Sequence, residues 1–159
     1  MKKFALAALV ALLVSAPAFA AGSSSTTQII AVVGNTVSIT SALPTSTTID
    51  VTATSSAIGS LTITSNTTGN WSISVTSANN GNMKGDNTAG LYPYKITLAP
   101  STGAAIFENQ SIGTGLSTTL TTGVGAVTYN LTALYSTASS LGLAADTYRD
   151  SVTVTVAAQ

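Results

Sequence analysis

The feature that most constrains the fold of this chain is the alternation of apolar with small polar residues over short stretches. The clearest case is residues 70–77 (NWSISVTS), where Trp71, Ile73 and Val75 alternate with hydroxyl-bearing side chains. Successive side chains of a β-strand point to opposite faces, so this pattern predicts a strand with one buried face. Trp71 is the largest side chain of that face, and we expect it to anchor the core rather than to bind a sugar.

The same alternation recurs between turns rich in Gly, Asn, Ser and Pro. It predicts strands at residues 36–40, 47–53, 92–98, 125–135 and 147–156. It also predicts a β-hairpin over residues 61–77, with a polar turn at 65–69, and a loop over 78–87. Seven to nine short strands at this spacing predict an all-β fold, an immunoglobulin-like β-sandwich of two antiparallel sheets.

One stretch does not alternate: residues 28–33 (QIIAVV), which we call the leader, are apolar on both faces. A strand of this kind is normally enclosed on both sides. Burying each large side chain is worth roughly 1.5 to 3 kcal/mol, and ordering each backbone unit costs about 1 to 2 kcal/mol. Because these contributions are similar, the leader also needs paired backbone groups, inside a sheet or a groove. Its candidate subunit-contact residues are Ile29, Ile30, Ala31, Val32 and Val33.

The start of the chain has the pattern of a secretory signal peptide. Lys2 and Lys3 precede an apolar stretch at residues 4–14, and residues 18–20 (AFA) form a small-x-small cleavage signature. The apolar stretch is shorter than the ~20 residues of a membrane-spanning helix. We therefore expect cleavage after residue 20, export without membrane insertion, an extended segment at 21–35, and one sandwich domain at 36–159.

The composition argues against most enzymatic and metal-dependent functions. The chain has no Cys and no His, which removes the usual nucleophile-base pairs and nearly every zinc site. Residues 78–87 lack the ligand spacing of a calcium loop, and Asp146 and Asp150 would lie about 13 Å apart on an extended strand, too far for paired-carboxylate hydrolysis. We expect no enzymatic activity, no cofactor and no metal. Without the signal, three basic residues remain against five acidic ones, so no basic surface for nucleic acid is expected.

The two ends of the mature chain resemble those of chaperone-usher pilins and of related spore-coat-U-type secreted domains. Residues 145–156 (ADTYRDSVTVTV) resemble their terminal Gly-x-Tyr-x-Asp-x-Val-x-Val strand, with Asp146 in place of the glycine. The matching residues of this terminal strand are Tyr148, Asp150, Val152, Val154 and Val156.

The leader, in turn, resembles the donor strand of these families. Many members carry a cysteine pair that this chain lacks, although the cysteine-free arrangement also resembles the enterotoxigenic class of fimbrial major subunits. The resemblance implies a sandwich that lacks one strand. In those families a periplasmic chaperone fills the gap until the N-terminal tail of the next subunit replaces it. The resemblance therefore implies a periplasmic chaperone, an outer-membrane usher and other copies of this chain as partners. It also implies passage through the periplasm to a fibre on the cell surface.

Two classes of function remain open at this stage. The first is a structural subunit of a bacterial surface fibre or coat, assembled non-covalently by strand exchange with other copies of itself. Exposed sheet edges are normally protected by charged side chains, and only eight remain here, as expected if the edges are paired by assembly. The same sparse charge is equally compatible with a secreted surface that Ser, Thr and Asn keep soluble. The alternative is a self-contained secreted β-sandwich that binds a glycan or a host surface through loops such as residues 79–87.

Overall fold

The computed structural model describes residues 27–121, 123–137 and 142–159. The chain divides into two units after Val32, and of the first unit residues 27–32 are described. The predicted signal peptide and residues 21–26 of the extended segment therefore lie outside the described residues. The second unit is an immunoglobulin-like β-sandwich of two antiparallel sheets, as the alternation predicts.

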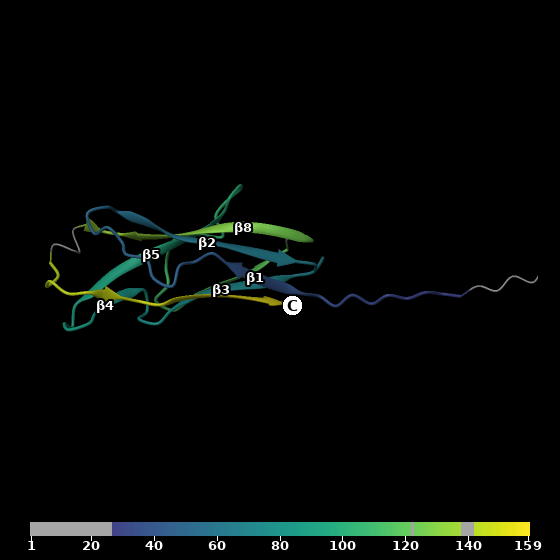
Figure 1. Cartoon of the computed structure of the whole chain (residues 1–159), viewed down its shortest axis with the longest axis horizontal. Helices are drawn as coiled ribbons and strands as arrows, with labels where there is room; N and C mark the ends of the chain where they lie inside the picture. The colour runs from purple at the N-terminus through teal and green to yellow at the C-terminus, as the bar shows by residue number, and fades with distance from the viewer. Residues whose placement is uncertain (1–26, 122, 138–141) are drawn as a thin grey trace, which may run out of the picture. The chain divides into compact units, whose positions relative to one another are not determined.

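Within the described residues, the larger sheet contains seven strands and the smaller sheet three. The larger sheet has the order β1 (Val37–Ser41), β2 (Ser55–Ser65), β8 (Gly125–Tyr135), β5 (Leu91–Pro100), β4 (Asn82–Gly85) and β9 (Tyr148–Arg149), with β6 (Phe107–Ser111) also paired to β5. The smaller sheet has the order β10 (Val152–Ala158), β3 (Trp71–Ser77) and β7 (Leu116–Leu120). Figure 1 shows β2, β5 and β8 in one layer and β3 in the other.

The core lies between the two layers and is built by the inward residues of alternating strands. Trp71, Ile73 and Val75 are at most 1% exposed, and they face Leu61 and Ile63 of β2 within one cluster of buried side chains. The ring of Tyr92 meets that of Tyr135 edge to face, with centroids 5.8 Å apart. Such pairs add to the free energy gained from burial alone.

The predicted strand at 47–53 is wrong. Those residues form a turn, because the Asp50 carboxylate accepts hydrogen bonds from the backbone N–H of Thr52 (2.8 Å) and from its hydroxyl (2.6 Å). The Ala53 N–H donates to the Asp50 carbonyl in the same turn. Side chain to backbone bonds of this kind give Asp a local alternative to strand pairing.

The predicted hairpin at 61–77 is also wrong, since β2 and β3 belong to different sheets. The connection between them carries the chain from one layer to the other. Thr67 is fully buried at this crossing, where its N–H donates to Ser65 Oγ and its hydroxyl accepts from the Gly69 N–H. A hairpin turn would leave such a threonine in solvent. The predicted loop at 78–87 contains a further short strand, β4, which pairs with β5 and β9.

The terminal strand predicted at 147–156 is divided in two. Tyr148 lies in β9, which pairs with β4, whereas Val152, Val154 and Val156 lie in β10, which pairs with β3. All four side chains nevertheless pack against the core, Tyr148 from the larger sheet and the three valines from the smaller one. The break falls at Asp150 and Ser151, where the Asp150 carboxylate binds groups of the β3–β4 turn instead of leaving the strand straight.

Candidate subunit interface

The terminal strand β10 has one hydrogen-bonded neighbour, β3, in the part of the chain that the structure describes. The Ala78 N–H donates to the Ser151 carbonyl, and the Gln159 N–H donates to the Asn70 carbonyl. These bonds direct the backbone groups of odd-numbered residues toward β3. In an antiparallel pair the backbone groups of alternate residues point to opposite sides, so those of Val152, Val154 and Val156 point to the open side.

The first strand, β1, has the same character at its own edge. It pairs with β2, where the Asn66 N–H donates to the Thr36 carbonyl and the Ala42 N–H donates to the Ser60 carbonyl. Even-numbered residues therefore bond to β2. The backbone groups of Val37 and Ile39 point away from it.

These two open edges meet where the layers come together, since β1 and β10 lie within 8 Å of each other, measured between Cα atoms, without being paired. We call this place the seam. Its partly buried apolar side chains pack against the core cluster, and they are Val37, Ile39, Val152, Val154 and Val156. The residues whose backbone groups are open thus also direct apolar side chains inward. The seam is incomplete in both hydrogen bonding and packing.

The leader shows the opposite condition, because its apolar side chains are exposed and no strand is assigned to it. Ile29 is 93% exposed, Ile30 71%, Val32 91% and Val33 79%. Four large β-branched side chains within five residues, all exposed to water, form an apolar surface of the kind that marks a contact with another molecule. Residues 28–33 take part in none of the strand pairings of the described chain, so the need for paired backbone groups that the sequence predicts is not met there.

Asn66 fixes the point at which the leader joins the sandwich. Its side-chain oxygen accepts from the Thr36 N–H (2.6 Å), and its side-chain NH₂ donates to the Gly34 carbonyl (3.0 Å). The Asn66 N–H donates to the Thr36 carbonyl as well. Sequence reasoning missed this residue, because its partners lie 30 and 32 positions away. The C-terminal end of the leader therefore joins the sandwich at the β2–β3 connection, where β10 also ends.

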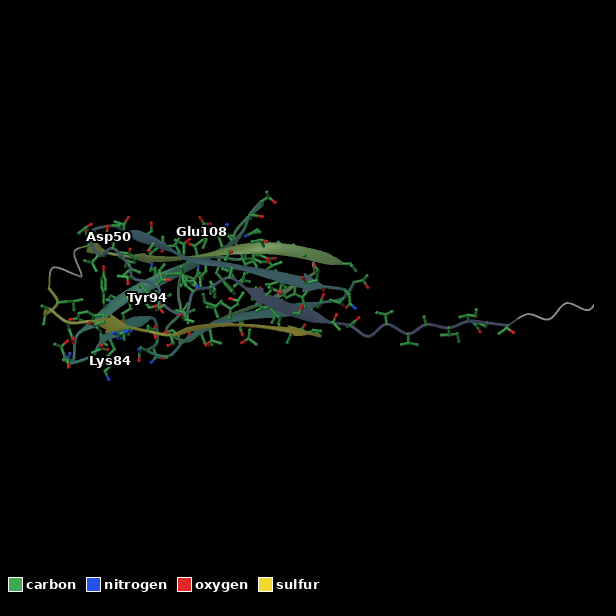
Figure 2. The ribbon with its side chains drawn as sticks, viewed as in Figure 1. Asp50, Lys84, Tyr94 and Glu108 are labelled. Carbon is green, nitrogen blue, oxygen red and sulfur yellow. The ribbon has the colours of Figure 1, made fainter. Side chains whose placement is uncertain are left out.

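Asp150 holds the other end of β10. Its carboxylate accepts hydrogen bonds from the hydroxyls of Ser77 (2.5 Å) and Tyr94 (2.6 Å), and from the N–H groups of Asn79 (3.0 Å) and Ser151 (2.7 Å). Figure 2 shows Tyr94 between the two layers. Burial, together with the hydrogen bond and charge of Asp150, raises the pKa of Tyr94 well above its usual value. The start of β10 is thereby tied to β3 and β5.

Asp146, which stands where the pilin pattern has glycine, binds the loop after β4. Its carboxylate accepts from the backbone N–H groups of Asn87 (2.8 Å) and Thr88 (2.8 Å). Hydrogen bonds, led by that of the Asn87 N–H, lower the pKa of Asp146 to about 2. Nearby, the Arg149 guanidinium meets the Asp86 carboxylate at 2.9 Å on the surface. Both contacts are structural, and they account for most of the charged groups that the sequence shows near the terminal strand.

The described residues contain no group of three or more His, Cys, Asp or Glu side chains placed to hold a metal ion. No helix within 27–121, 123–137 and 142–159 is long and apolar enough to cross a membrane.

Comparisons with known proteins add little to this description. No family model matches the chain, and no curated protein matches it. Among solved structures, it is similar to a chain in the crystal structure of the CsuC–CsuE chaperone–tip adhesion subunit pre-assembly complex from archaic chaperone-usher Csu pili of Acinetobacter baumannii. That similarity has a TM-score of 0.46 at 21% sequence identity, and it covers 78% of this chain and 40% of the other.

Proposed function

We propose that this protein is the structural subunit of an exported bacterial fibre, in which the leader of one copy occupies the seam of the next. The observation that carries the proposal is the complementarity of the two parts. The seam offers unpaired backbone groups beside half-covered valines. The leader is a β-branched run whose side chains are exposed and whose backbone is unpaired. Adding a strand to an open edge is a common mode of recognition between proteins.

The point at which the leader joins the sandwich sets the direction of insertion. The C-terminal end of the leader lies beside the β2–β3 connection, and β10 ends at that same connection. A leader that ran parallel to β10 would bring the β2–β3 connections of two copies together and close a symmetric pair. A leader that runs antiparallel to β10 brings the β2–β3 connection of one copy to the Asp150 end of the next. Only the second arrangement repeats head to tail and generates a filament.

Insertion also requires a change in the seam. A strand placed between two others needs about 4.8 Å on each side, whereas the Cα atoms of β1 and β10 approach within 8 Å. The two strands must therefore move apart as the leader enters. We expect a copy without a bound leader to have a partly closed seam, which a chaperone of the periplasm would hold open before assembly at an outer-membrane usher.

The experiment uses the mature chain, starting at residue 21, and a variant that carries Ile30→Asp and Val32→Asp. The expected result is that the mature chain forms detergent-resistant polymers, which appear as a ladder in unboiled gels and as monomer after boiling. The variant should remain monomeric, because two carboxylates would have to be buried at the seam. Val124→Asp is the matched control, since Val124 is 67% exposed outside both the leader and the seam, and it should polymerise normally.

A second measurement separates loss of assembly from loss of folding. A synthetic peptide of residues 23–33, added to the monomeric variant, should raise its melting temperature, while a peptide of the same composition in scrambled order should not. A mature chain that stays monomeric, and a variant indifferent to the peptide, would show that the seam accepts no strand. The self-contained secreted sandwich would then be the better description.

A further inference from the structure

The outer face of the larger sheet carries an elongated groove that the fibre proposal does not use. It consists of two adjoining hollows, of about 590 and about 630 Å³, which share Asn109 and Leu134. Both hollows are widely open to solvent. The outward-facing residues of β5 run along the groove, and they are Pro93, Lys95, Thr97 and Ala99. Because the groove follows one strand across both hollows, its shape suits an elongated ligand.

A β-bulge in β6 forms one wall. Ile96 pairs with Gln110 and Leu98 with Phe107, so Thr97 alone stands opposite Glu108 and Asn109. The Asn109 N–H donates to the Thr97 hydroxyl at 3.1 Å, and Asn109 has a φ of 50°. Bulges redirect side chains and are frequent beside functional sites. Figure 2 shows Glu108 on the side of the larger sheet that faces away from the smaller one.

The turn between β3 and β4 forms the far end of the groove. Asn80 lies there with a φ of 55°, followed by Gly81. Within the described residues, Asn80 and Asn109 are the non-glycine residues with a positive φ, and both line the groove. Such conformations gather at ligand-binding positions. No hydrogen bond occupies either side-chain amide in the described part of the chain, and no ion pair occupies Lys95 there.

We propose that this groove binds a neutral oligosaccharide. Amide and hydroxyl side chains can both donate and accept hydrogen bonds, as sugar hydroxyls do. The groove presents them mainly in its first hollow, from Asn80, Asn109, Ser55, Ser111 and Ser136, and the second hollow adds Thr97. Leu134 and Pro93 supply apolar surface for the C–H faces of the rings. One lysine and one glutamate balance each other, so the groove has no net charge to attract a polyanion.

The recognition would depend on hydrogen bonds rather than on stacking. Tyr94 and Tyr135 border the groove, but they are 6% and 7% exposed, so their rings belong to the core. Removing the two free amides should therefore remove most of the specificity. Because both asparagines have positive φ, glycine can replace them without strain in the backbone, which makes Asn80→Gly with Asn109→Gly the appropriate double variant.

The test is saturation-transfer NMR on the mature chain, a method that tolerates polymers. The probes are cellotriose, maltotriose and triacetylchitotriose, with trigalacturonate as the charged comparison. We expect saturation of at least one neutral trisaccharide over more than one ring. The double variant should weaken its binding about tenfold to a hundredfold, the loss of two hydrogen bonds. Asn70→Gly, an exposed asparagine of the β2–β3 connection, is the matched control and should bind as the native chain does.

Three results would overturn the proposal. The first is the absence of binding by any of the neutral probes. The second is a preference for trigalacturonate that disappears with Lys95→Ala, which would make the ligand an acid. The third is binding that the double variant leaves unchanged, which would place the sugar elsewhere. None of these outcomes bears on polymerisation, because Asn80, Lys95 and Asn109 lie outside both the leader and the seam.

Discussion

The hydrogen bonds of Asp150 give the most direct test of how β10 is held in place. The Asp150→Ala substitution removes the acceptor for two hydroxyls and two backbone N–H groups. Leaving one buried donor unpaired costs about 1 to 3 kcal/mol. Asn79 lies near solvent and Ser151 is exposed, so water can replace the carboxylate at those two N–H groups. The unpaired hydroxyls of Ser77 and Tyr94 therefore account for most of the cost. We expect Asp150→Ala to lower the free energy of unfolding by about 3 to 5 kcal/mol.

The assay is thermal unfolding of the mature chain, followed by circular dichroism, with the Ile30→Asp/Val32→Asp background used to keep every sample monomeric. For a domain of this size each kcal/mol corresponds to about 3 to 5 °C, so the melting temperature should fall by about 10 to 20 °C. Tyr94→Phe is the matched control, because it removes one of the four donors and should cost about 1 to 2 kcal/mol.

The variant that carries both Asp150→Ala and Tyr94→Phe shows whether the two side chains share one hydrogen bond. When Asp150 is already alanine, Tyr94→Phe removes a hydroxyl that has lost its acceptor, so the second loss should be smaller than the first. A fall of less than about 3 °C for Asp150→Ala, which is under 1 kcal/mol, would refute the reasoning. Strictly additive losses would also refute it, since they would mean that Tyr94 and Asp150 do not share a hydrogen bond in solution.

Three other predictions concern the core, the leader and pH. Trp71→Ala should lower the free energy of unfolding, measured in urea, by about 3 to 5 kcal/mol, because the indole is fully enclosed in the core. Asn66→Ala should increase the rate of proteolysis just before β1, since the side-chain bonds to Gly34 and Thr36 are lost. Asn66→Asp keeps the acceptor for the Thr36 N–H and should show an intermediate rate. Asp146 has a folded pKa of about 2, below its unfolded value, so its contribution to the stability of the fold is present above pH 4 and is lost as the pH falls toward 2. Acid unfolding of Asp146→Asn should lack that part of the pH dependence, and an unchanged curve would count against the Asn87 contact.

The sequence predicted the strands better than their partners. Alternation identified the inward face of β3 correctly, because a period of two depends only on local geometry. It did not show that β3 pairs with β10 and β7 rather than with β2, since pairing is decided by contacts between distant segments. The same limit explains the error at Asp150, whose partners at Ser77 and Tyr94 lie 73 and 56 positions away.

The candidate sites were predicted to different degrees. The leader was recognisable because a run that is apolar on both faces is conspicuous in a chain of Ser, Thr and Asn. The seam was not recognisable, since an open strand edge has no composition of its own. It follows only from which residues of β10 bond to β3, as shown by the backbone bonds of Ser151 and Gln159. The groove was missed altogether. Its walls come from a bulge and a turn, and neither has a periodic signal.

The leader joins the sandwich at the same connection where β10 ends. This has a consequence for the ends of the proposed fibre. A line of identical copies must always terminate in one unused leader and one vacant acceptor, whatever its length, whereas a closed ring has neither. Line and ring can therefore be distinguished by titration with labelled leader peptide. Linear material would take up one peptide per particle, so the uptake per mass would report the mean length, and rings would take up none.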